Sequence, residues 1–96
     1  MLRKARIGDV RAIHRMINQS SQKGEMLPRS LMDIYGNLRD FFVYYDKDEH
    51  SIIGICAMSI IWENLAEIRS LYVEDDHRRQ GIAKKLVEAC ISEAIT

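Results

Sequence analysis

The hexapeptide RRQGIA, residues 78–83, places two arginines and a glycine directly ahead of a helical pattern. The first amides of a helix have no partner within it, and they carry the positive end of the helix dipole. Gly81 lets an anion approach the backbone, small Ala83 leaves the first turn clear, and the two arginines add charge. The stretch therefore favours a pyrophosphate site, with a solvated basic turn as the alternative.

A second group of residues could act on an amine and a carboxylate. Glu67 has apolar neighbours in a strand pattern, and burial would suit its carboxyl group to removing a proton. Arg29 stands just before a helix start, where its two-pronged guanidinium could hold a carboxylate. Arg69 would share the sheet face of Glu67. The alternatives are a solvated strand face for Glu67, a surface position for Arg29 and a plain salt bridge between Glu67 and Arg69.

The histidines and cysteines predict neither a metal site nor a disulfide. His14, His50 and His77 lie in a helix, a turn and a loop, without the spacing of metal ligands. Cys56 and Cys90 each lie in an apolar run, which is typical of free buried thiols. No signal peptide or membrane span is visible, and a reducing cytoplasm fits this cysteine usage best.

Length and composition predict one small domain over residues 1–96. The chain is 47% apolar and has no shift in composition that would mark a second domain. Its 14 basic and 14 acidic residues cancel, which removes the bulk-charge argument for binding nucleic acid or an anionic membrane. We therefore expect neither a nucleic-acid nor a membrane partner.

Periodicity predicts the elements that must position these residues. A short strand over residues 2–7 precedes a helix that Asp9 can cap and that ends near Ser20. A loop follows by composition. Ser30 with Asp33 resembles a capping box, which starts a second helix.

Three strands and a last helix complete the pattern. Period-two alternation predicts strands over residues 41–46, 51–62 and 65–73, joined as an antiparallel meander. Residues 82–95 carry apolar side chains at helical spacing, which predicts an amphipathic helix against the sheet. The order strand, helix, helix, three strands, helix indicates a layered α/β or α+β fold.

With these residues and elements in place, a family resemblance follows. The stretch LAEIRSLYVEDDHRRQGIAKKLVEA, residues 65–89, resembles the acetyl-CoA-binding motif of the Gcn5-related N-acetyltransferases, and that family has the same element order. Within the superfamily, RKARIGDVRAIHRMI, KGEMLPRS and LAEIRSLYV are similar to the acetyltransferase domain of bacterial N-acetylglutamate synthases. The resemblance implies a GNAT-like acyl-CoA N-acyltransferase fold and an N-acetyltransferase that uses acetyl-CoA and no metal.

The resemblance also implies where the coenzyme binds. Its pyrophosphate would meet main-chain amides of the turn and of the first helical residues, with charge added by the arginines: Arg78, Arg79, Gln80, Gly81, Ile82 and Ala83. Main-chain groups of Leu71 and Val73 would pair with the pantetheine arm and polarise the thioester carbonyl. Both residues also suit the core, and the two interpretations are compatible because the implied contact is through the backbone.

The implied substrate is the amine of a small amino acid, with L-glutamate as the best candidate and a place in arginine biosynthesis. Glu67 would be the base that acts on the amine, directly or through water. Arg29 and Arg69 would hold the carboxylates. Two alternatives stay open: a non-catalytic coenzyme A-binding or interaction module, and an acetyltransferase for peptide or polyamine amines. An acidic cleft would favour polyamines, whereas an arginine-lined cleft would favour amino acids.

One departure from the family sets a further expectation. The family's domain normally continues with another strand, a helix and a hairpin, which carry the far wall of the coenzyme cleft and often a tyrosine that protonates the departing thiolate. We expect the chain to be a fragment of a longer protein, with a naturally short form as the alternative. The strand over residues 65–73 would then be an apolar edge, so we expect self-association, most simply as a homodimer.

Overall fold

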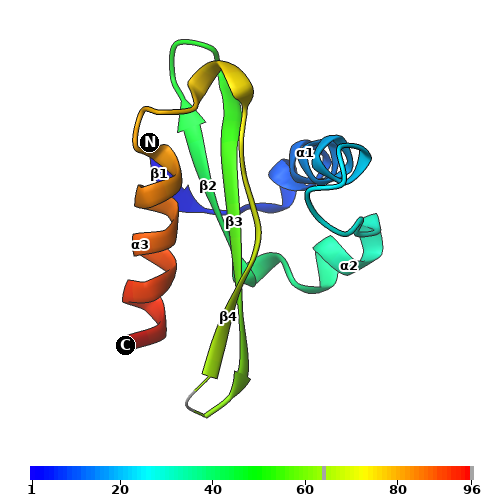
Figure 1. Cartoon of the computed structure of the whole chain (residues 1–96), viewed down its shortest axis with the longest axis vertical. Coiled ribbons are helices and arrows are strands. Elements are labelled where there is room, and N and C mark those ends of the chain that lie inside the picture. The colour runs from blue at the N-terminus through cyan, green and yellow to red at the C-terminus, as the bar shows by residue number, and fades with distance from the viewer. Residues whose placement is uncertain (64, 96) are drawn as a thin grey trace.

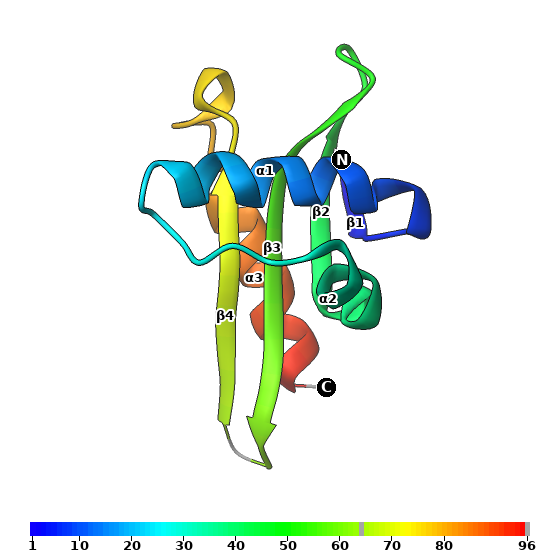
Figure 2. The same ribbon diagram turned by 90° about the vertical axis from the view of Figure 1, so that its right-hand side faces the viewer.

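The computed structural model describes residues 1–63 and 65–95, and it has three layers. An antiparallel four-stranded sheet in the order β1-β2-β3-β4 forms the middle layer. Helices α1 and α2 cover one face and α3 covers the other (Figures 1 and 2). The elements are β1 (Leu2–Lys4), α1 (Val10–Gln22), α2 (Leu31–Gly36), β2 (Phe41–Asp46), β3 (Ser51–Trp62), β4 (Leu65–Val73) and α3 (Ile82–Ile95). The expected α/β fold and element order are confirmed.

The larger core lies between the sheet and α1. Four apolar residues of α1 recur on one helical face and are fully buried: Val10, Ile13, Met16 and Ile17. They meet Phe41 and Val43 of β2 and Ile55 of β3. The apolar face of α1 and the apolar face of the sheet therefore fix how the helix crosses the strands, because only one orientation buries both faces.

A second core lies between the sheet and α3. Ile82, Leu86 and Cys90 face the sheet, where they form one cluster with Ile53, Cys56 and Met58 of β3 and Val73 of β4. A Cβ atom on Gly54 would lie 3.2 Å from Ile82 Cγ2 and 3.2 Å from Leu86 Cδ1, so the missing side chain lets the helix approach β3 closely. This contact holds the first two turns of α3 against the sheet.

The two cysteines lie inside this second core as free thiols. Cys56 and Cys90 are both fully buried, and their Sγ atoms are 3.6 Å apart. The neighbouring thiol and burial both raise the pKa of Cys56. A buried thiol of raised pKa is a poor nucleophile. The expectation of two free buried thiols is confirmed.

The N-terminal half differs from the expectation in three details. Strand β1 ends at Lys4, and α1 continues to Gln22, beyond the expected end. Asp9 precedes α1 but makes no capping bond to it; its carboxylate accepts from the Arg6 amide at 2.8 Å and from the Arg3 guanidinium at 2.6 Å. The capping role for Asp9 is therefore wrong, because an arginine on β1 binds the same oxygen atoms.

The second helix starts as expected but is short. The Ser30 hydroxyl accepts from the Asp33 amide at 3.0 Å, which closes the first turn of α2. The helix ends at Gly36, and a 3₁₀ turn, η2 (Leu38–Asp40), leads into β2.

No helix within the described part of the chain is long and apolar enough to span a membrane.

Candidate functional site

The turn between β4 and α3 presents free amide groups beside an open space. The 3₁₀ turn η3 (Asp75–His77) follows β4, and Arg79 and Gly81 then adopt left-handed φ angles of 69° and 78°. The Lys85 amide donates to the Gly81 carbonyl at 3.1 Å, so Gly81 is the residue from which α3 begins. The next three amides have no acceptor within the helix, and they carry its positive dipole.

Arg78 fixes this turn to the end of the strand. Its Nε atom donates to the Val73 carbonyl at 3.0 Å, its NH2 atom lies 3.3 Å from Asp75, and its guanidinium lies 5.6 Å from the Tyr72 ring centroid. These contacts occupy much of the Arg78 guanidinium. Arg78 therefore stabilises the turn, and the exposed Arg79 is the cation better placed to bind an anion.

A cavity of about 470 Å³ adjoins the turn. Seven of the eight predicted coenzyme residues line it together: Leu71, Val73, Arg78, Arg79, Gly81, Ile82 and Ala83. Gln80 does not, because its side chain lines a separate hollow beside Tyr44 and Tyr45. The sequence reasoning missed four further residues that line the large cavity and had no distinguishing pattern: Ser20, Glu25, Tyr72 and His77.

The outer edge of β4 forms one side of this cavity. Strand β4 is the last strand of the sheet, so its outer edge has no paired strand within the described residues. The register against β3 shifts between Ile55 opposite Tyr72 and Ala57 opposite Arg69. Ser70 and Leu71 thus oppose Cys56 alone, which defines a β-bulge, and Ser70 has a φ of 54°. The bulge disrupts the β3–β4 ladder at this point and leaves one residue of β4 unpaired with β3.

A second hollow of about 340 Å³ lies farther back along β4. It brings together the predicted base and both predicted carboxylate-binding arginines, Glu67, Arg29 and Arg69. Its remaining lining comes from the loop before α2, from α2 and from β4: Met26, Leu27, Pro28, Asp33, Ile68 and Ser70. The two hollows share strand β4, since one takes residues 67–70 and the other takes residues 71–73.

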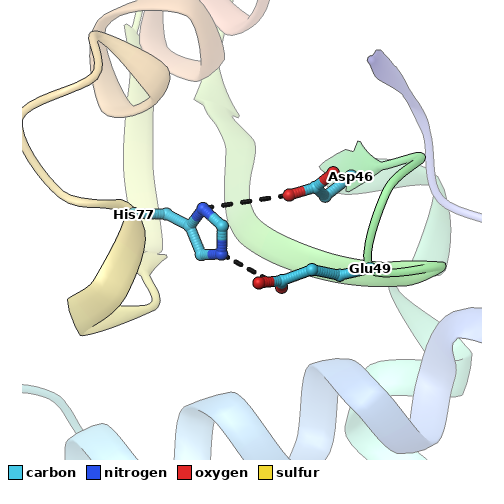
Figure 3. Close-up of side chains that lie close together, drawn as sticks. All are labelled: Asp46, Glu49 and His77. Atoms are coloured by element: carbon cyan, nitrogen blue, oxygen red, sulfur yellow. Dashed lines mark hydrogen bonds and ion pairs between the residues drawn. The ribbon is translucent and has the colours of Figure 1, made fainter.

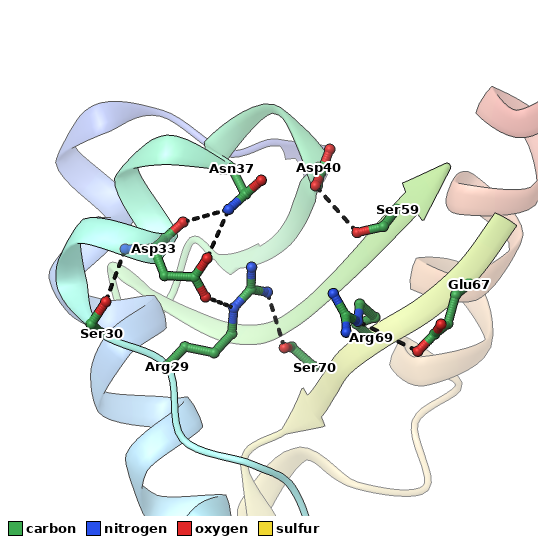
Figure 4. A network of polar contacts seen from close by, with 9 residues as sticks. All are labelled: Arg29, Ser30, Asp33, Asn37, Asp40, Ser59, Glu67, Arg69 and Ser70. Atoms are coloured by element: carbon green, nitrogen blue, oxygen red, sulfur yellow. Dashed lines mark hydrogen bonds and ion pairs between the residues drawn. The ribbon is translucent and has the colours of Figure 1, made fainter. Parts of the chain in front are cut away.

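Arg29 is held firmly at the second hollow. Its Nε atom donates to Asp33 Oδ2 at 2.7 Å, its NH1 atom lies 3.4 Å from Ser70 Oγ, and its guanidinium lies 5.1 Å from the Phe41 ring centroid (Figure 4). The side chain is 13% exposed. Arg29 is thus not an ordinary surface arginine, and among the described residues its hydrogen bonds use Nε and NH1.

Asp33 and Asn37 support this arginine from α2. The Asn37 side-chain amide donates to Asp33 Oδ1 at 2.8 Å, which leaves Oδ2 for Arg29 (Figure 4). The Arg29 guanidinium beside Asp33 holds the pKa of that carboxyl below its usual range. Asp33 was not predicted as part of the site, although its spacing of four residues from Arg29 was visible in the sequence.

Glu67 and Arg69 differ from the expectation in their surroundings. Their side chains are 50% and 54% exposed, so the expected burial of Glu67 is wrong. The reason is the position of β4 at the sheet edge, where apolar neighbours in sequence do not cover it. Both side chains share one face, as expected, and Arg69 Nε lies 3.4 Å from Glu67 Oε1 (Figure 4). The plain salt bridge considered from the sequence is therefore present.

Comparison with known proteins identifies the family. The acetyltransferase (GNAT) family model matches residues 9–96, and the chain belongs to this family. It is 42% identical over 87 residues to an uncharacterized N-acetyltransferase of Chlorobaculum tepidum, covering 91% of this chain and 55% of that protein. It is 27% identical over 95 residues to the amino-acid acetyltransferase of Mycobacterium tuberculosis, covering 98% and 54%. The chain thus spans about half the length of these curated relatives.

Solved structures share the fold. The Mycobacterium tuberculosis protein Rv2747, in complex with CoA and NLQ, superposes with a TM-score of 0.92 at 27% identity, covering 99% of this chain and 57% of that one. The N-acetylglutamate synthase of Neisseria gonorrhoeae, in complex with coenzyme A and N-acetyl-glutamate, gives a TM-score of 0.91 at 22% identity, covering 99% and 22%. The predicted GNAT fold is thereby confirmed.

Proposed function

We propose that the chain forms the coenzyme-binding and amine-binding part of an acetyl-CoA-dependent N-acetyltransferase for a small amino acid, with L-glutamate as the leading substrate. The observation that carries the proposal is the arrangement along β4. A helix N-terminus and an open strand edge line one hollow, and an acid with two arginines lines the next. The acetyltransferase family and the named amino-acid acetyltransferase relative support it.

The coenzyme would bind across the first hollow. Its pyrophosphate would accept hydrogen bonds from the amides of Ile82 and Ala83, and exposed Arg79 would add charge. Its extended pantetheine arm would pair with the backbone of Leu71 and Val73, as peptides add to an open sheet edge. Val73 is also buried against α3, so it can serve the core and the coenzyme at once.

Acetyl transfer would take place near the bulge. The neutral amine attacks the thioester carbonyl, the new C–N bond forms, the C–S bond breaks and coenzyme A leaves as a thiolate. Main-chain donors at Ser70 and Leu71 would stabilise the negative charge that develops on the carbonyl oxygen. Glu67 would accept the proton of the amine, and its half-exposed position favours transfer through a water molecule.

The arginines would select the substrate. Arg29 is held at Nε by Asp33 and more loosely at NH1 by Ser70, so a forked contact with a carboxylate would use NH2 together with NH1, whose long contact with Ser70 would give way. Arg69 lies on the strand that carries Glu67 and would reach the second carboxylate of glutamate. The Glu67–Arg69 ion pair supports the alternative of a non-catalytic coenzyme-binding module, because that pair must open before either group meets a substrate.

Self-association is part of the proposal. No strand among the described residues pairs with the outer edge of β4. Large apolar side chains are exposed on the β3–β4 hairpin and on the last turns of α3: Ile60, Trp62, Leu65, Ile91 and Ile95. A homodimer would cover both features. Sedimentation equilibrium would show a dimer, whereas a folded monomer at high protein concentration would contradict this part.

A substrate panel tests the function. Acetyl-CoA is mixed with the protein and with L-glutamate, L-glutamine, spermidine or a short peptide, and the released thiol is measured. We expect turnover with amino acids, fastest with glutamate. Turnover of spermidine or the peptide, without turnover of any amino acid, would contradict an amino-acid substrate and would indicate a polyamine or peptide acetyltransferase. Tight binding of acetyl-CoA in calorimetry, without turnover of any amine, would support the non-catalytic module instead.

A further inference from the structure

Three potential metal ligands meet at the turn that precedes α3. Asp46 and Glu49 lie at the end of β2 and in the β2–β3 turn, and His77 lies in η3 (Figure 3). One ligand atom from each residue lies within 4.8 Å of the other two. Spacing in the sequence predicts no metal site here, because only the fold brings His77 back to the end of β2.

The imidazole ring of His77 lies between the carboxylate groups of Asp46 and Glu49. Its Nε2 atom lies 3.0 Å from Glu49 Oε2, and its Nδ1 atom lies 3.9 Å from Asp46 Oδ2. A neutral imidazole donates from one nitrogen only, and an ionised carboxylate only accepts. A neutral His77 can therefore donate to only one of the two carboxylates, and its other ring nitrogen keeps a lone pair that can bind a cation.

We propose that Asp46, Glu49 and His77 form a binding site for one divalent cation of the zinc class. An imidazole nitrogen with two carboxylate oxygens is a ligand set that Zn²⁺ accepts, at bond lengths of about 2.0–2.2 Å. Mg²⁺ prefers oxygen ligands alone, so this set discriminates against it. The ion would neutralise the two carboxylates and bind the imidazole lone pair.

The surroundings prepare two of the ligands. The Asp48 amide donates to Asp46 Oδ1 at 2.9 Å, which orients that carboxylate and leaves Oδ2 directed at His77. The His77 and Asp46 side chains are 14% and 21% exposed, so both are held by packing. Glu49 is 52% exposed on the turn and is free to close by the small movement that tight coordination needs.

The site also lies next to the coenzyme cavity. His77 lines that cavity together with Gly81, and η3 leads directly into the turn at residues 78–81. An ion would tie the β2–β3 turn to η3 and so restrain the segment that precedes the helix N-terminus. A cation that binds only the folded chain must also raise its thermal stability.

Titration of Zn²⁺ into the chelator-stripped chain tests the proposal. Calorimetry should show one saturable site at micromolar concentration, weaker binding of Mn²⁺ and none of Mg²⁺, and Zn²⁺ should raise the melting temperature by several degrees. His77→Ala and Glu49→Gln should each weaken Zn²⁺ binding at least tenfold. The second substitution keeps size and shape, so it remains informative if His77→Ala does not fold.

One substitution on the same turn serves as a control. His50→Asn removes an exposed imidazole from a left-handed residue, where asparagine is tolerated. This variant should bind Zn²⁺ like the unmodified chain. Absence of saturable binding would overturn the proposal. Equal binding by His77→Ala and Glu49→Gln would also overturn it, since the ion would then lie elsewhere.

Discussion

A valine at position 81 should weaken coenzyme binding without preventing folding. Gly81 has a φ of 78°, and a Cβ atom built there meets no protein atom within 4 Å. The new side chain would therefore project into the open space at the start of α3, where the account places the pyrophosphate. The cost to the free chain is the left-handed conformation alone, about 1–2 kcal/mol.

A matched control separates this strain from the loss of a ligand. Gly24 has a φ of 75° and open space around its missing Cβ, but it does not line the cavity. Gly24→Val and Gly81→Val should lower the free energy of unfolding by similar amounts in urea denaturation. Only Gly81→Val should weaken acetyl-CoA binding, at least tenfold, or about 1.4 kcal/mol.

Isothermal titration of both variants with acetyl-CoA is the assay. It is run at a temperature where each variant is folded by circular dichroism. If folded Gly81→Val and the unmodified chain bind acetyl-CoA with equal affinity, the proposed pyrophosphate site at the start of α3 is refuted. An equal loss in both variants would show that the effect comes from general destabilisation and not from the cavity.

Three other predictions concern β4, α2 and the contact of α3 with the sheet. Glu67→Gln should lower kcat with little change in acetyl-CoA affinity, and the rate should recover at high pH, where the amine is already neutral; a rate that stays low at high pH indicates a structural role. Asp33→Asn should raise KM for the amino acid more than it lowers kcat, because Arg29 loses its support. The pKa of Asp33 in the folded chain lies below its unfolded value, so Asp33 stabilises the fold above the unfolded pKa, and this stabilisation is lost as pH falls through the folded pKa. The free energy of unfolding of Asp33→Asn, measured against pH, should lack this loss. The same pH profile in the variant and the unmodified chain would contradict the argument. Gly54→Ala should destabilise the chain by about 1–3 kcal/mol through contact with α3, whereas Gly36→Ala, which meets nothing within 4 Å, should be neutral or mildly stabilising in the same denaturation series.

The regular elements could be predicted where the hydrophobic period was long and clear. Strands β2, β3 and β4 and helix α3 have the expected bounds, because alternation of period two or 3.6 persists through each of them. Helix α2 starts where the capping pattern predicts, but it ends at Gly36, and a 3₁₀ turn follows before β2. A short hydrophobic pattern defines the bounds of an element poorly, because the sequence does not show the surface against which the element packs.

The site was predictable in its residue types but not in its environment. The helix start after Gly81 could be inferred because it depends on local backbone chemistry. The exposure of Glu67 could not, because it depends on β4 being the edge strand. The bulge at Ser70 has no sequence signal, and the cluster at His77 requires the turn after β2 to meet the turn after β4. Errors thus arose where tertiary position, and not local pattern, decides the outcome.

Chemical-shift mapping tests the central claim most directly. The chain is labelled with ¹⁵N and titrated first with coenzyme A and then with L-glutamate. The account predicts that coenzyme A shifts the amides of Gly81, Ile82 and Ala83 together with Leu71 and Val73, and that glutamate then shifts the Arg29 and Arg69 side-chain signals. Shifts confined to other surfaces, or a glutamate response that leaves both arginines unchanged, would contradict the assignment of the two hollows along β4.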